Sequence, residues 1–240
     1  VSCSFVAITC AATFLFSSLE SCATGTCFIL FYLSLLRSYQ DKRAPGIAFY
    51  SFACLGIASL FFVQILYFVP FLWILMASNM MALTHRMFWA TVLGLVMPYW
   101  FAVGYYVVTN QFDAFIDHFA ELAQFEPLLQ YETLDIHRIA TFGLVALLAV
   151  IGIIHYMRNS YLDKIRTRMI FEMFITVDIL SFVFIILQPQ HFDNLLPIII
   201  VNSSCLFAHY VALTRTWLTN VTFIVMCLAT LGITIFNLMP

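Results

Sequence analysis

The feature that most constrains this chain is a succession of long apolar runs separated by short polar segments. A helix that crosses a bilayer needs roughly 20 mainly apolar residues, and helices satisfy their own backbone hydrogen bonds in lipid. Only 9% of the residues are charged and 63% are hydrophobic, which leaves too little polar surface for a soluble protein. The runs are 1–16, 24–36, 47–63, 65–77, 88–108, 139–156, 170–187, 195–213 and 221–239.

These runs predict an all-α fold, a polytopic transmembrane helix bundle that crosses the membrane about eight or nine times. We expect residues 1–240 to form a single integral membrane domain. The stretch 47–77 is too long for one helix and too short for two full crossings, and Gln64 and Pro70 interrupt it. It is predicted to be a short-helix hairpin that enters and leaves on one side.

The Lys and Arg residues indicate the orientation, because loops rich in them stay in the cytoplasm. If 47–77 is a hairpin, the basic loops are 37–46, 78–87, 157–169 and 214–220. Together they hold every Lys and Arg of the chain except Arg138. These loops are therefore predicted to be cytoplasmic and the loop 109–138 to be periplasmic.

The loop 109–138 is acidic and its first half has helical periodicity. Its carboxylates are Asp113, Asp117, Glu121, Glu126, Glu132 and Asp135. Apolar residues recur at spacings of three and four between Phe112 and Ala123, opposite the acidic ones. We predict an amphipathic helix that lies on the outer face of the membrane and ends at Pro127.

An intramembrane polar cluster is predicted at Asp178, Asn202 and His209. An ionisable group near the middle of a spanning helix costs roughly 2.5–3.5 kcal/mol to insert and usually has a partner. Asn202 and His209 are seven residues apart on the run 195–213, so they share a face at the depth of Asp178. The cluster is either a proton or substrate site or a polar contact between neighbouring helices.

A second set of candidates lies on the predicted outer face. Its catalytic candidates are Asp113, Asp117, Glu121 and Arg138, and its weak metal-ligand candidates are His118, His137, His191 and Asp193. Imidazoles and carboxylates bind divalent metals, and a guanidinium binds phosphate. No spacing here is diagnostic, so a solvated acidic surface is the alternative.

Common catalytic and nucleotide-binding motifs do not occur in the sequence. It contains no G-x-x-x-x-G-K-[ST], no H-E-x-x-H, no G-x-S-x-G and no C-x-x-C. We therefore expect no cofactor. The net charge of −2 predicts no nucleic-acid partner.

The segment 46–100 has a recognisable rhythm: G-x-A-S-L, an apolar run, a proline, a second apolar run, a basic residue and L-G-x-x-x-P-Y. It resembles an uncharacterised family of polytopic inner-membrane proteins of Bacteroidota, which implies a bacterial inner membrane. More faintly, it resembles the membrane core of GT-C glycosyltransferases, which use polyprenyl-phosphate donors at the outer face. The short loop 17–23 departs from that family, because Glu20 is its only carboxylate.

Three hypotheses for the function follow. The first is a cell-envelope subunit, scaffold or lipid-handling protein, whose partners are the lipid bilayer and other membrane proteins. The second is a GT-C-like transferase that acts on a lipid-linked substrate at the outer face. The third is a proton-coupled transporter that uses Asp178.

Overall fold

The computed structural model describes residues 1–124, 135–213 and 217–238. These residues form helices and turns and no strand, and six of the helices are long and apolar enough to cross a membrane. The prediction of an all-α membrane protein is confirmed. The predicted count of about eight or nine segments is not confirmed. The other apolar helices, Ser2–Ala11, Pro45–Phe61 and Val63–Ser78, are shorter.

The chain forms two compact units. The first contains Val1–Cys22 and Leu129–Pro240, and the second contains Ala23–Leu128. Helix α2 (Leu19–Leu35) begins in the first unit and continues into the second.

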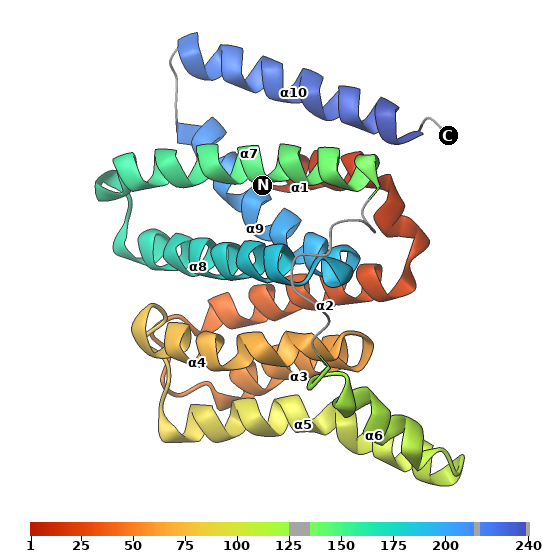
Figure 1. Cartoon of the computed structure of the whole chain (residues 1–240). Coiled ribbons are helices and arrows are strands. Elements are labelled where there is room, and N and C mark those ends of the chain that lie inside the picture. Colours follow the sequence, from red (N-terminus) through yellow and green to blue (C-terminus); the bar gives the residue numbers. More distant parts are fainter. Residues whose placement is uncertain (125–134, 214–216, 239–240) are drawn as a thin grey trace. The chain divides into compact units, whose positions relative to one another are not determined.

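In the second unit, two short helical segments form a hairpin (Figure 1). It follows η2 (Leu36–Ser38) and consists of α3 (Pro45–Phe61), η3 (Val63–Phe68) and α4 (Val69–Ser78). The backbone amide of Gln40 donates a hydrogen bond to the carbonyl of Met80 at 3.0 Å. The segments before α3 and after α4 therefore lie at the same end of the hairpin, as the sequence-based prediction requires.

The hairpin turns at a different residue from the predicted interruptions. Phe62 breaks the helix with an extended backbone (φ −140°, ψ 92°). Gln64 is buried within η3, and Pro70 occupies the first turn of α4. Proline is tolerated there because the amide it lacks would have no intrahelical partner.

Helix α5 (His85–Val108) packs closely along α3. It begins after Thr84, whose hydroxyl accepts a hydrogen bond from the Met87 amide at 3.3 Å. Glycines permit the close approach of the two backbones. A Cβ at Gly56 would lie 2.6 Å from the Leu95 carbonyl oxygen, and one at Gly94 would overlap the Phe49 carbonyl oxygen.

The predicted amphipathic helix is present as α6 (Phe112–Ala120), but it ends earlier than predicted. Its backbone hydrogen bonds tighten to a three-residue spacing after Glu121, and the Leu122 carbonyl accepts a hydrogen bond from the Tyr67 hydroxyl. Pro127 lies outside the described residues together with Glu126 and Glu132.

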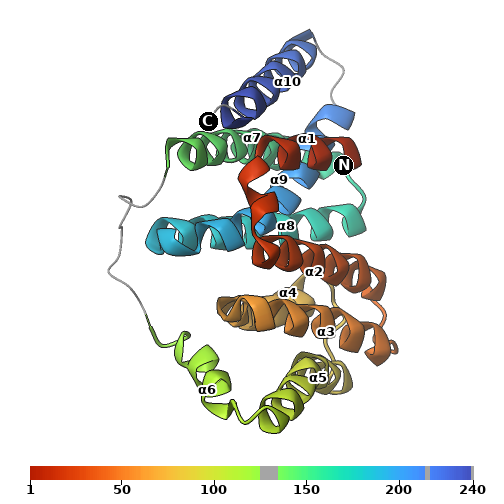
Figure 2. The ribbon, with the colours of Figure 1, turned by 90° about the vertical axis from the view of Figure 1, so that its right-hand side faces the viewer.

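The first unit is built around α9 (Phe192–Leu213), its most buried helix. Figure 2 shows α9 between α7 (Ile136–Asn159) and α8 (Ile165–Leu187). Every residue of α9 from Leu195 to Ser204 is buried, so its neighbours cover the whole circumference of the helix there. The remaining helical segments of this unit are α1 (Ser2–Ala11), η1 (Thr13–Ser17), η4 (Ser160–Leu162), η5 (Pro189–His191) and α10 (Trp217–Leu238).

Large apolar side chains are exposed on the outer faces of the helices. Examples are Trp100 at 77%, Leu147 at 52% and Leu228 at 63% exposed. Exposed apolar side chains in such number need a covering of lipid or protein. In α7 the buried residues follow the helical repeat from Thr141 to Tyr156, so one stripe faces the unit's core and the opposite face is left for lipid.

Candidate functional site

Two parallel helices of the first unit, α7 and α9, position the candidate site. Near their starts Arg138 binds Asp193, and near their ends the rings of His155 and Tyr210 lie 5.1 Å apart. The two helices lie close together at Gly152, where a Cβ would lie 2.8 Å from the Leu206 Cβ. His155 lies about one turn beyond this crossing on α7, which brings its ring beside α9.

Two imidazoles meet at this end, with the ring centroids of His155 and His209 6.0 Å apart. The Asn159 Nδ2 donates to the carbonyl oxygen of His155 at 3.1 Å and to its Nδ1 at 3.0 Å. Neutral His155 therefore carries its proton on Nε2. The Asp163 carboxylate lies 2.9 Å from His209 Nε2, so the proton of His209 is on that nitrogen.

The other nitrogens of the two rings, His155 Nε2 and His209 Nδ1, are both buried and have no hydrogen-bond partner among the described residues. Aromatic rings surround the pair, with the Phe171 ring 4.4 Å from that of His209. The Tyr156 hydroxyl donates to the Arg168 carbonyl at 2.9 Å and ties α7 to α8.

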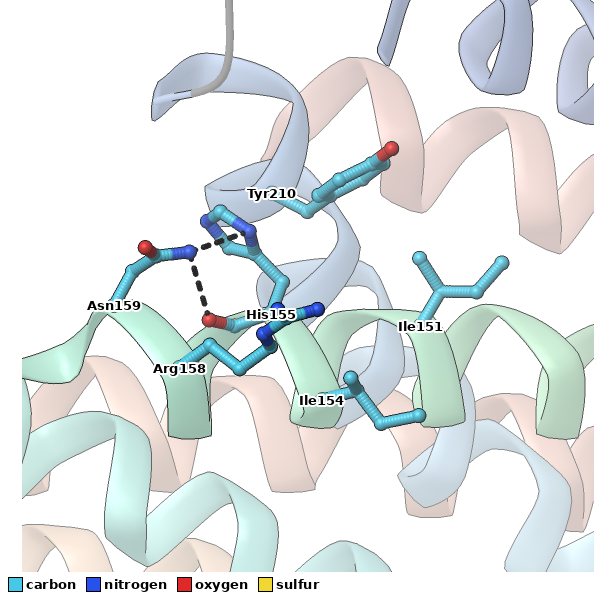
Figure 3. A pocket seen from close by; sticks show the side chains of 6 residues that line it. All are labelled: Ile151, Ile154, His155, Arg158, Asn159 and Tyr210. Carbon is cyan, nitrogen blue, oxygen red and sulfur yellow. Dashed lines mark hydrogen bonds between the residues drawn. The ribbon is translucent and has the colours of Figure 1, made fainter. Parts of the chain in front are cut away.

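A polar pocket of about 510 Å³ lies beside the imidazoles (Figure 3). We call it the polar pocket; its lining residues are Ile151, Ile154, His155, Arg158, Asn159 and Tyr210. Among the described residues no carboxylate forms an ion pair with Arg158. The carboxylate of Asp163, nearby in sequence, is bound to His209 instead.

A second pocket of about 420 Å³ lies between α1, α7, α9 and α10. We call it the apolar pocket, since its lining is almost entirely apolar. Ala7 and Ile8 come from α1, Leu148 from α7, Phe207 from α9 and Phe223 from α10. Its size falls within the range of about 300–1,000 Å³ that is typical of small-molecule sites.

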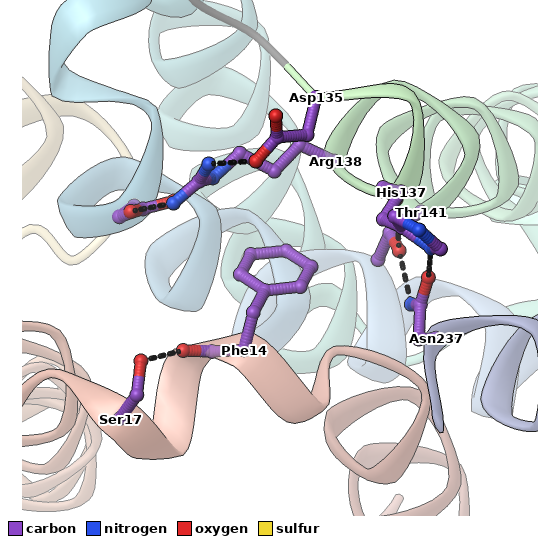
Figure 4. A network of polar contacts seen from close by, with 8 residues as sticks. Phe14, Ser17, Asp135, His137, Arg138, Thr141 and Asn237 are labelled. Atoms are coloured by element: carbon purple, nitrogen blue, oxygen red, sulfur yellow. Dashed lines mark hydrogen bonds and ion pairs between the residues drawn. The ribbon is translucent and has the colours of Figure 1, made fainter. Parts of the chain in front are cut away.

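Asn237 anchors α10 at the opposite end of this unit (Figure 4). Its Nδ2 donates to the Ala11 carbonyl at 2.7 Å and to the Thr141 hydroxyl at 2.8 Å. Its Oδ1 lies 3.2 Å from His137 Nδ1, which therefore carries a proton. These bonds join α10 to α1 and α7, the helices that form the apolar pocket with it and α9.

Arg138 belongs to a polar network at that same end (Figure 4). Its Nε and Nη2 each donate to the Asp193 carboxylate at 2.9 Å, and its Nη1 donates to Asp135 at 2.8 Å. The guanidinium also lies over the Phe14 ring, 5.6 Å from the centroid. The bidentate pair joins the starts of α7 and α9 and occupies the nitrogens that a phosphate would need.

In the structure, Asp178 and His209 of the predicted intramembrane cluster bind different residues. Asp178 is fully buried on α8, and Ser203 Oγ donates to its two carboxylate oxygens at 3.3 and 3.4 Å. Asn202, the neighbour of Ser203, is also fully buried. His209 lies nearer the end of α9 and binds Asp163 instead of Asp178. The contact between the Ser203 hydroxyl and the Asp178 carboxyl group joins α8 to α9.

The predicted acidic candidates lie in the second unit. Asp113 and Asp117 are on α6 and Glu121 directly follows it, and all three are exposed. Arg138 belongs to the first unit. None of these four residues lines either pocket described above.

The predicted metal-ligand candidates have separate partners. His118 Nε2 donates to the Ser59 carbonyl at 3.0 Å, and His191 lies 3.3 Å from Gln190 Nε2. His137 binds Asn237, and Asp193 binds Arg138. Within the described parts of the chain, no three His, Cys, Asp or Glu side chains are grouped as metal ligands.

Four residues of this region, His155, Arg158, Asn159 and Asp163, were not predicted as site residues from the sequence. A usable signal was present, because His155 lies inside an apolar run with Asn159 one helical turn beyond it. The distribution of apolar residues alone, however, indicates only a helix end followed by a basic loop in this segment. Compared with family models, with curated proteins and with solved structures, the chain shows no match.

Proposed function

We propose that this protein is a multi-pass membrane protein that binds a lipid molecule and handles it within the cell envelope. The observation that carries the proposal is the apolar pocket formed by α1, α7, α9 and α10. An acyl or isoprenoid chain is the matching occupant, because burial of apolar surface favours it and it needs no polar partner.

The surroundings of the pocket support a lipid as the occupant. The outward residues of α10, such as Leu228 (63% exposed) and Leu231 (59% exposed), form an apolar surface like that of a helix facing acyl chains. Leu231 also lines the apolar pocket. A chain from the surrounding bilayer would thus reach the pocket across a continuous apolar surface.

Filling the apolar pocket provides the direct test. Ala7→Trp places an indole where the chain would lie, and we expect co-purified lipid to fall at least severalfold. Val6→Trp is the matched control, because Val6 is the preceding residue on α1, is 57% exposed and does not line the pocket. Native mass spectrometry of the purified protein measures the retained lipid. Equal lipid retention by Ala7→Trp and the wild type would refute the proposal.

We also propose that the protein lies in an inner membrane with the loops 37–46, 78–87, 157–169 and 214–220 in the cytoplasm. The bond between Gln40 and Met80 supports this orientation, since it keeps the first two of these loops at one end of the hairpin. The excess of Lys and Arg in these loops favours the cytoplasmic side. The resemblance to inner-membrane proteins of Bacteroidota agrees with the location.

Thiol labelling tests the orientation. Lys42 and Asp113 are both exposed, so cysteine at either position is accessible in a variant whose native cysteines are serine. We expect an impermeant maleimide added to intact cells to label Asp113→Cys and to leave Lys42→Cys unmodified until the membrane is opened. The reverse labelling pattern would invert the proposed orientation.

A further inference from the structure

The polar pocket and the apolar pocket lie next to each other along the same two helices. On α7, Leu148 lines the apolar pocket and Ile151 lines the polar pocket. On α9, Phe207 lines the apolar pocket and Tyr210 lines the polar pocket, and their ring centroids are 6.0 Å apart. Three residues correspond to a rise of about 4.5 Å along a helix, and α7 and α9 run in the same direction.

This arrangement matches an amphipathic molecule. One end of it would lie against apolar side chains, and about one helical turn away the other end would meet Arg158, Asn159 and Tyr210. We propose that the polar pocket binds the phosphate of an anionic lipid whose chain occupies the apolar pocket. This inference rests on the proposed function and adds the chemical class of the headgroup.

Arg158 provides the charge that selects an anion. It is exposed at the rim and has no ion pair with a described carboxylate, whereas Arg138 pairs with Asp135 and Asp193 and Arg168 pairs with Glu172. The carboxyl end of a helix repels anions, so the end of α7 would hold a phosphate only with this cation present. Both amide hydrogens of Asn159 are donated to His155, so the guanidinium of Arg158 supplies the hydrogen bonds to the phosphate oxygens.

The basic segment that follows α7 would bring anionic lipids to this end. Lys164, Arg166 and Arg168 lie just beyond η4, and such a cluster attracts anionic headgroups by about 1 kcal/mol for each basic residue near the surface. This general attraction must be separated from binding in the pocket. Lys164 is the suitable control, since it is exposed at the same end and does not line the pocket.

The experiment compares lipid selection by four forms of the protein: wild type, Arg158→Gln, Lys164→Gln and Ala7→Trp. Each is reconstituted in nanodiscs of equal parts phosphatidylglycerol and phosphatidylcholine, and retained lipid is counted by native mass spectrometry. We expect wild type and Lys164→Gln to prefer phosphatidylglycerol and Arg158→Gln to lose this preference about tenfold, the loss expected for one charge-assisted hydrogen bond. Arg158→Gln should still retain lipid.

The outcomes separate the two proposals. An unchanged preference in Arg158→Gln, or an equal loss in Lys164→Gln, overturns the headgroup assignment while lipid binding itself stands. Full lipid retention by Ala7→Trp overturns the proposed function. The last measurement adds inorganic phosphate to the wild type and to Arg158→Gln. If phosphate stabilises only the wild type and does not displace phosphatidylglycerol from it, the pocket binds free phosphate. The headgroup assignment then fails.

Discussion

Replacing Gly94 with alanine is expected to lower the free energy of unfolding by at least about 1–3 kcal/mol, the cost typical of overpacking a close-packed interior. Gly94 is buried where α5 crosses α3. The new methyl group would overlap the Phe49 carbonyl oxygen and lie 3.1 Å from the Ala53 amide nitrogen. Backbone atoms cannot rotate away as a side chain can, so the two helices would have to separate.

Gly104→Ala is the matched control for Gly94→Ala. Gly104 lies on the same helix, is exposed, and a Cβ there would meet no atom within 4 Å. Alanine favours helix over glycine by about 1 kcal/mol, so the control should be at least as stable as the wild type. Tryptophan fluorescence during thermal unfolding reports on this region through Trp73, Trp89 and Trp100. Equal melting midpoints for the two variants would contradict the close crossing of α3 and α5.

Replacing Gly152 with alanine is expected to have a second large effect, this time on the candidate site. The added Cβ would lie 2.8 Å from the Leu206 Cβ and 2.9 Å from its carbonyl carbon, so α7 and α9 would be pushed apart. We expect a loss of about 1–3 kcal/mol in unfolding free energy. His155 and Tyr210 lie just beyond this crossing, so lipid retention should fall as well.

Gly143→Ala separates the packing effect from any general effect of alanine in α7. Gly143 is exposed on the same helix and a Cβ there would meet nothing within 4 Å. Measured together, the melting midpoint in detergent and lipid retention should be no lower than the wild type in Gly143→Ala and reduced in Gly152→Ala. A variant Gly152→Ala that melts like the wild type would show that α7 and α9 do not approach as closely as described.

The helices and their order could be predicted with little more than the distribution of apolar residues. The run 139–156 identifies α7, and the interrupted stretch 47–77 identifies the hairpin of α3 and α4. The ends of the helices were less predictable than the helices themselves, because polar residues outside an apolar run can also belong to the helix. Thr84 caps α5 ahead of its apolar run, and α6 ends at Ala120, two residues before Leu122, whose carbonyl binds the Tyr67 hydroxyl.

The partners of the polar residues were less predictable than the helices. His209 was expected near Asp178, yet it binds Asp163 in the connection between α7 and α8. Asp178 is instead bound by Ser203, which is one residue from the predicted Asn202. Helical spacing correctly relates residues of one helix. It contains no information on the rotation of a neighbouring helix, and a rotation of one residue changes which side chain faces the contact.

The sequence by itself determined that this is an all-helical protein for a lipid environment, with a short-helix hairpin and an amphipathic helix. Those properties depend on the free energy of each segment in lipid, and each segment is contiguous in the sequence. Only the tertiary structure decided that His155, Arg158 and Tyr210 line one pocket, because that depends on how closely Gly152 lets α7 approach α9. A hydrogen bond or a close contact extends only about 3–4 Å, so such sites follow from packing between helices rather than from the composition of any one of them.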